Sequence, residues 1–211
     1  PDQGENYSVV THTSDLAAFI RALDVGPVYL VGRSYGGTIA LRTALYFPDL
    51  VKGVVAQEPT IAASAITEPA QNALLKRERS GLADAKRAAK AGTLDEATRL
   101  FADWTNDQPG GFDALPKSVR TVHLENGRTI PLHFAAPRPP RITCDQLAQI
   151  QMPVVLTTGE TTRPFFRVLA EAAHQCIQGS ELIEIANARH AATSQNPGAF
   201  NAIVLNLLAE N

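Results

Sequence analysis

The sequence predicts an α/β fold with a parallel sheet and a helical insertion, and three observations support this prediction. Four short apolar runs have the length and composition of buried strands, at 28–31, 51–57, 154–158 and 181–185. Segments with helical spacing lie between the first and second runs and between the third and fourth, which is the order of a parallel βαβ unit. From about 61 to 151 the pattern changes, and residues of high helix propensity dominate.

The first part of the chain alternates helix and strand. The expected helices cover 14–23 and 38–47, and the expected strands cover 28–31 and 51–57. The first helix has a Ser-Asp start and ends near Gly26, and the second is closed by Pro48. Glu58 and Pro59 end the second strand.

The rest of the chain divides into an insertion and a return to the alternating pattern. Residues 61–151 form the insertion, with a break at Gly92, and 143–150 is the helix that leads back to the sheet. The remaining elements are strands at 154–158 and 181–185 and helices at 164–175 and 197–208. We therefore expect a core made of 1–60 and 152–211, and a mostly helical cap or lid made of 61–151.

The composition describes an ordinary globular protein and limits its partners. Of 211 residues, 45% are hydrophobic and 19% are charged, and the net charge of −2 gives no reason to expect nucleic acid as a partner. No apolar run approaches the roughly 18 residues that span a bilayer. Cys144 and Cys176 form no metal or redox motif. We expect them to be reduced thiols, and they do not indicate in which cellular compartment the protein resides.

The strand at 28–31 runs directly into Gly32-Arg33-Ser34-Tyr35-Gly36, a Gly-x-Ser-x-Gly motif followed by a helix. A sharp strand-to-helix turn holds a serine hydroxyl out of the backbone as a nucleophile, and it strains the backbone of that serine. A side chain at either glycine is expected to collide with the neighbouring strand or helix. Ser34 would lie at a helix N-terminus, which favours developing negative charge.

A serine nucleophile needs a base, and His190 is the candidate. It follows the last strand and leads into the C-terminal helix, so it is expected at the sheet edge that carries Ser34. The other histidines do not follow a strand and are interpreted as surface or capping residues: His12, His123, His133 and His174.

From Ser14 to Leu208 the chain resembles the α/β-hydrolase superfamily with a cap domain, on the strength of the Ser34 motif and the late His190. The resemblance implies a doubly wound, mostly parallel sheet that carries a Ser–acid–His triad. In most relatives the acid stands three residues after the glycine that ends the penultimate strand, and here that position is Thr162. Two carboxylates remain as alternatives, Glu58 and Glu160. We favour Glu58, because it ends the strand at 51–57 and some relatives place the acid after the corresponding strand.

The resemblance also sets expectations for the oxyanion hole and for the sheet. The backbone N–H of Tyr35 supplies one oxyanion donor, whereas the family's second donor comes from an early loop that this sequence does not contain. The family's sheet usually has eight strands, and this chain supplies the last four. The strand at 28–31 is then a bare edge, and we expect a preceding segment or a separate chain to complete the sheet, because the chain begins at Pro1.

The expected function is that of a serine hydrolase that cleaves a carboxylic ester or a related acyl bond of a small molecule, without a metal or an organic cofactor. A cofactor-free C–C hydrolase or lyase with the same triad is one alternative, and a non-catalytic ligand-binding relative is another. Aromatic residues of the insertion are candidates for the pocket wall: Phe101, Trp104, Phe112 and Phe134. Arg33 and Arg163 flank the site and are expected to be solvated.

Overall fold

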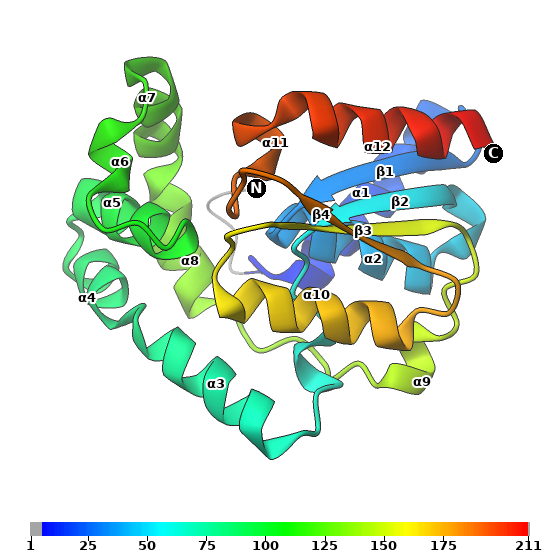
Figure 1. The fold of residues 1–211 in the computed structure, drawn as a ribbon, viewed down its shortest axis with the longest axis horizontal. Coiled ribbons are helices and arrows are strands. Elements are labelled where there is room, and N and C mark those ends of the chain that lie inside the picture. The colour runs from blue at the N-terminus through cyan, green and yellow to red at the C-terminus, as the bar shows by residue number, and fades with distance from the viewer. Residues whose placement is uncertain (1–5, 211) are drawn as a thin grey trace.

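A computed structural model describes residues 6–210, so the expectation that concerns Pro1 lies outside the described residues (Figure 1). Its sheet has four parallel strands in the order β1-β2-β3-β4: β1 (Val28–Arg33), β2 (Val51–Gln57), β3 (Val154–Gly159) and β4 (Glu181–Ile185). The predicted α/β class and all four predicted strands are confirmed. Because the strands are parallel, their C-terminal ends lie at one edge, which faces the helices at the left of Figure 1.

Helices cover both faces of the sheet. On one face, α2 (Tyr35–Tyr46) packs on β1 and β2 and α10 (Pro164–Cys176) packs on β3 and β4, and the core between them includes Val54 and Ala56 of β2. On the other face, α12 (Pro197–Glu210) packs on Val55 and its neighbours. This alternation follows from the period-two geometry of a strand and gives the sheet two apolar cores. Figure 1 shows α12 above the sheet and α10 below it.

The first helix is longer than predicted. α1 (Val9–Leu23) begins five residues before Ser14, because the side chain of Ser8 caps it by accepting a hydrogen bond from the N–H of Thr11. Three further predicted helices are confirmed within three residues at each end: α2 after the sharp turn at Ser34 (the elbow), α10 after β3, and α12 at the C-terminal end.

The segment between β2 and β3 is helical, as predicted. It contains α3 (Pro69–Ser80), α4 (Ala83–Ala91), α5 (Leu94–Thr105), α6 (Gly111–Ala114), α7 (Lys117–Asn126) and α8 (Ile130–Ala135), followed by the short α9 (Cys144–Leu147). α3 to α8 lie beside the sheet, whereas α9 returns beneath it next to α10 (Figure 1). The break at Gly92 is confirmed, and a second break at Gly81 separates α3 from α4.

The two cysteines are not reduced thiols. Cys144 and Cys176 form a disulfide that joins α9 to the end of α10. Their Cα atoms lie 4.9 Å apart although 32 residues separate them in sequence. The expectation was wrong because cysteine spacing carries no information about how α9 packs on α10. The disulfide fixes the place where the helical segment rejoins the sheet.

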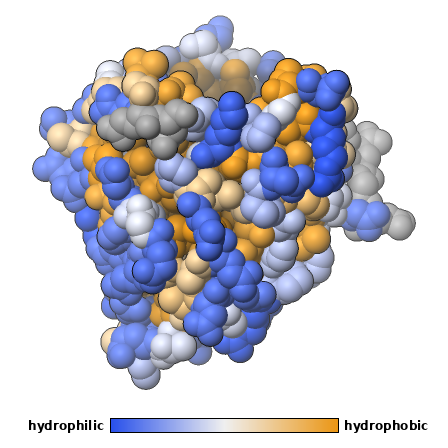
Figure 2. Space-filling view, turned by 90° about the vertical axis from the view of Figure 1, so that its right-hand side faces the viewer, coloured by the Kyte–Doolittle hydropathy of each residue, from blue (hydrophilic) through white to orange (hydrophobic). Residues whose placement is uncertain are grey.

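β1 is an edge strand of the described sheet, as expected. Within residues 6–210 it pairs with β2 alone, and Val31 near its end is 51% exposed. Other large apolar side chains are also exposed, among them Phe19, Val25 and Leu205. Figure 2 shows hydrophobic residues open at the surface on the end of the molecule where α12 finishes. Among the described helices, none is both long and apolar enough to cross a membrane.

Candidate active site

Ser34 sits between β1 and α2 in a strained conformation. Its φ of 55° and ψ of −115° lie outside the regions that non-glycine residues favour. Two backbone hydrogen bonds hold it there: its N–H donates to Gln57 at 2.7 Å, and its carbonyl accepts from the N–H of Thr38 at 2.9 Å. The side chain of Ser34 caps nothing in α2. The local structure is therefore the sharp strand–turn–helix that the motif predicts.

The two glycines of the motif have different surroundings. A Cβ at Gly32 would lie 2.5 Å from the backbone of Gly36, which is closer than real contacts allow. A Cβ at Gly36 would meet nothing within 4 Å among the described residues, and the tight contact falls on Gly37 instead. The expectation that both motif glycines are sterically required is confirmed for Gly32 and wrong for Gly36. The reason is that Gly36 lines an open hollow beside β1, together with Val31 and Tyr35.

This difference predicts opposite results for two alanine substitutions. Gly32→Ala forces the elbow apart and is expected to destabilise the protein by about 2 kcal/mol or more, or about 4–8 °C in Tm. Gly36→Ala should leave stability within about 1 kcal/mol of the wild type, because alanine favours a helix. Thermal unfolding of the two variants and the wild type compares them directly. Equal destabilisation by both would show that Gly36 is packed.

Glu58 and His190 meet at the same sheet edge. Glu58 is fully buried directly after β2, and its Oε2 lies 2.5 Å from Nδ1 of His190. Its other oxygen, Oε1, accepts a hydrogen bond from the N–H of Gly159 at 2.8 Å. Like Ser34, Glu58 has a positive φ, 47°. Because Arg33 and Gln57 are paired in register, Ser34 and Glu58 follow the ends of neighbouring strands.

The alternative acid lies elsewhere. The carboxylate of Glu160 accepts a hydrogen bond from the N–H of Asn187 at 2.7 Å and holds the loop after β4. Thr162, at the position where most relatives carry the acid, is buried, and its hydroxyl has no hydrogen-bond partner among the described residues. The structure thus brings Glu58 to His190 and leaves Glu160 as an exposed loop carboxylate.

The surroundings of His190 hold its ring in one orientation and favour its neutral form. The ring is 5% exposed and stacks on Phe166 with centroids 3.8 Å apart. Burial lowers the pKa of His190, and the hydrogen bond that His190 donates to Glu58, together with the charge of Glu58, opposes this shift only in part. With Nδ1 directed to Glu58, Nε2 remains for a second partner. A neutral, fixed imidazole with one nitrogen available is suited to accept a proton.

Tyr35 follows the nucleophile and begins α2. Its N–H occupies the first helical position, where no intrahelical acceptor exists, so it is one of the free N–H groups at the N-terminus of α2. Its phenol hydrogen-bonds Nδ1 of His12 at 2.9 Å and contacts His133 edge-on at 5.4 Å. Burial raises the pKa of Tyr35, so the phenol stays neutral. Tyr35 thus links α1, the elbow and α8.

A cavity of about 300 Å³ lies between the helical segment and the sheet edge. Arg33, His190 and Ser194 line it from the core, and His123 and Phe112 line it from the helices. Of the four aromatic residues proposed for the pocket wall, Phe112 alone lines this cavity. Trp104 packs on Phe165 and Phe166, and Phe101 packs on Phe134.

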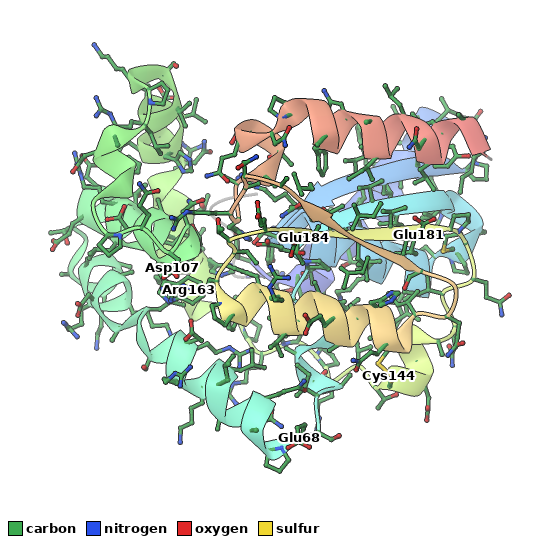
Figure 3. The ribbon with its side chains drawn as sticks, viewed as in Figure 1. Glu68, Asp107, Cys144, Arg163, Glu181 and Glu184 are labelled. Atoms are coloured by element: carbon green, nitrogen blue, oxygen red, sulfur yellow. A yellow bond between two sulfur atoms is a disulfide. The ribbon has the colours of Figure 1, made fainter. Side chains whose placement is uncertain are left out.

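Arg163 is not solvated as expected. It is 16% exposed, forms ion pairs with Asp107 and Glu78, and stacks over Trp104 at 4.9 Å. Figure 3 shows Asp107 and Arg163 side by side where α10 begins. Arg189 donates to the carbonyls of Asn106 and Asp107, directly after α5. Arg163 and Arg189 therefore join the helical segment to the part of the chain that forms the sheet.

Three residues contribute to this edge without having been predicted as part of the site. The N–H of Gly159 binds Glu58, Phe166 supports His190, and His123 lines the cavity although it was interpreted as a surface residue. Phe166 gave a usable signal, because it lies in the first turn of a helix that follows a strand at the same edge. The other two depend on long-range packing that no local pattern records.

Comparisons with known proteins agree with this architecture. A family model described as alpha/beta hydrolase fold matches residues 1–197. A Bacillus subtilis (strain 168) protein, named provisionally as a 2-succinyl-6-hydroxy-2,4-cyclohexadiene-1-carboxylate synthase, is 24% identical over 99% of this chain and 75% of its own length.

Two solved structures are similar in fold at low sequence identity. MGS-M2, an alpha/beta hydrolase enzyme from a Medee basin deep-sea metagenome library, superposes with a TM-score of 0.72 at 20% identity. The match covers 100% of this chain and 77% of that one. The carboxylesterase CesB of Bacillus subtilis gives 0.67 at 20% identity, over 97% and 67% of the two chains. At this identity both matches concern the fold alone.

Proposed function

Because the chain belongs to the alpha/beta hydrolase fold family, we propose that it is a serine hydrolase that cleaves a carboxylic ester or a related acyl bond, such as a lactone or thioester, of a small molecule. In this proposal Ser34 is the nucleophile, His190 the general base and Glu58 the acid. The N–H of Tyr35 is one donor of the oxyanion hole.

The proposed reaction proceeds in two halves. In the first, Oγ of Ser34 attacks the carbonyl carbon while Nε2 of His190 takes its proton and passes it to the leaving alcohol. The N–H of Tyr35 and the positive end of the α2 dipole stabilise the oxyanion. In the second half, His190 deprotonates a water molecule, which attacks the acyl-enzyme; the bond from the acyl carbon to Oγ then breaks, and His190 returns the proton to Oγ of Ser34 as the acid leaves. Glu58 orients His190 and stabilises its cation throughout.

One observation supports this proposal above the others: the buried Glu58–His190 contact at the sheet edge that also carries the strained Ser34. Leaving a carboxylate fully out of water is costly, and two hydrogen bonds here offset that cost. A binding protein has no need of a serine at positive φ or of an imidazole held in one orientation at the same sheet edge. Together these features match the arrangement that a nucleophile, a base and an orienting acid require.

Hydrolysis of p-nitrophenyl acetate and butyrate tests the proposal. The wild type should hydrolyse both esters, and Ser34→Ala and Glu58→Gln should each lose most of that activity. Glu160→Gln is the matched control, since it removes a carboxylate from the same edge without touching His190. A wild type that is inactive on both esters and unreactive toward a fluorophosphonate would contradict the proposal.

The pH dependence of hydrolysis follows from the lowered pKa of His190. Because the base must be neutral, kcat/KM should rise with pH along a limb centred below the ordinary value of 6.5 and then level off. The same shift makes the unfolded chain bind this proton more readily, so stability should fall as pH drops through 6.5. A pH–rate profile from 4.5 to 8 gives the midpoint. A midpoint above 6.5 would mean that Glu58 outweighs burial.

Two structural proposals accompany the function. Residues 61–151 act as a cap that covers the pocket and selects the substrate, since helices of this segment form one wall of the cavity beside His190. The open edge of β1 pairs with a further strand, from a separate segment or chain. The exposed Val31 and the space beside Gly36 support this pairing.

A cofactor-free lyase or C–C hydrolase with the same triad is the second candidate. The observation that favours it is the name of the Bacillus subtilis relative, which is that of a synthase rather than a hydrolase. Under this alternative His190 abstracts a proton or Ser34 attacks a ketone. Labelling of Ser34 by a fluorophosphonate without turnover of any ester would favour it.

A further inference from the structure

Arg33 is a charged group beside the proposed nucleophile that the mechanism does not use. It is the last residue of β1 and directly precedes Ser34. Its side chain lines the cavity of about 300 Å³ together with His190 and His123. The positive charge of Arg33 also helps to lower the pKa of both histidines, after burial as the main cause.

The protein does not neutralise this charge. Within the described part of the chain no ion pair involves Arg33. Glu58 is near enough to favour the charged form of Arg33, but both of its oxygens are already bonded to His190 and Gly159. Asp103 is the one acidic residue among those that line the cavity, and its two oxygens accept from the N–H groups of Gly110 and Phe112.

The other arginines at this edge are different. Arg163 binds Glu78 and Asp107, Arg167 binds Glu184, and Arg189 binds backbone carbonyls. Each of them joins two parts of the structure. Arg33 joins none. Part of its side chain is exposed, as a group that receives a ligand requires, and the surrounding protein still lowers its pKa by desolvation.

We propose that Arg33 binds a carboxylate of the substrate and thereby selects small acyl compounds that carry a negative charge near the scissile carbonyl. The inference rests on the proposed function and names its substrate class. A guanidinium binds a carboxylate through two parallel N–H···O bonds. A bound anion would give Arg33 the ion-pair partner that the described part of the chain does not provide. Arg33 and the proposed base His190 line the same cavity, so an anion bound to Arg33 lies in the pocket that contains the base. Monoesters of short dicarboxylic acids carry both groups, an acyl bond for Ser34 and a carboxylate for Arg33.

The test compares two esters with one leaving group. Mono-p-nitrophenyl succinate carries the carboxylate, and p-nitrophenyl butyrate is a neutral ester of similar size. The wild type should prefer the succinate in kcat/KM, and Arg33→Gln should reduce the ratio of the two values by about 10- to 100-fold. Arg33→Lys should restore part of it. Arg87→Gln, which removes an equal charge from an exposed position on α4, should leave the ratio unchanged.

Two outcomes would overturn the inference. A ratio that Arg33→Gln leaves unchanged would show that no carboxylate binds there, and a parallel loss on both esters would make Arg33 a structural residue. Succinate binding, measured by calorimetry, separates this inference from the proposed function. If the wild type hydrolyses neither ester but binds succinate in a manner that Arg33→Gln abolishes, the proposed function fails and the inference stands. If it also fails to bind succinate, both fail.

Discussion

Ser34→Ala is expected to lower kcat/KM for ester hydrolysis by about 10³-fold or more, because the substitution removes the atom that forms the acyl-enzyme. The fold should survive, since the Ser34 side chain caps nothing and its backbone bonds to Gln57 and Thr38 do not need the hydroxyl. Initial rates with p-nitrophenyl butyrate, together with the Tm of each protein, measure both effects.

An exposed serine provides the control for this result. Ser14→Ala on α1 removes a hydroxyl away from the sheet edge and should change rates by no more than about threefold. A Ser34→Ala variant that folds normally and keeps its activity would contradict the account, because another nucleophile would then be responsible.

Glu58→Gln is expected to lower kcat by about 10²- to 10⁴-fold while changing KM little. The amide keeps the shape of the side chain and still accepts from Gly159, but it carries no charge to stabilise a protonated His190. It also presents an N–H₂ group that can force the imidazole into the wrong tautomer. Steady-state kinetics of Glu58→Gln and Glu160→Gln on one ester compare the two carboxylates directly.

Glu160→Gln is the control in this comparison, and a reversed result would contradict the assignment of Glu58 as the acid. Glu160→Gln should stay within about threefold of the wild type, because its carboxylate binds only the loop N–H of Asn187 in the site described here. Loss of activity in Glu160→Gln with retention in Glu58→Gln would reverse the assignment and would require the loop after β3 to rearrange during catalysis.

The strands and the elbow could be predicted from the sequence because their signals are local. Apolar runs of strand length, helical spacing and the motif around Ser34 each lie within a dozen residues. The placement of His190 at the correct edge also followed, since all parallel strands end on one side.

The choice of acid and the state of the cysteines depend on contacts between distant residues. Glu58 meets Gly159 and His190 across 101 and 132 residues, and only the order β1-β2-β3-β4 brings these positions together. The sequence therefore left Glu160 open as an alternative. The Cys144–Cys176 bond likewise requires α9 to pack on α10. Gly36 could not be judged, because its surroundings depend on what lies beyond the edge of β1.

Covalent labelling with a fluorophosphonate, followed by peptide mapping, is the decisive experiment for the proposed triad, because it detects an activated serine without any assumption about the substrate. We expect a single adduct on Ser34 in the wild type, much slower labelling in Glu58→Gln, and none on the corresponding peptide of Ser34→Ala. An unlabelled wild type, or an adduct on another serine, would contradict the claim that Ser34, His190 and Glu58 form a catalytic triad.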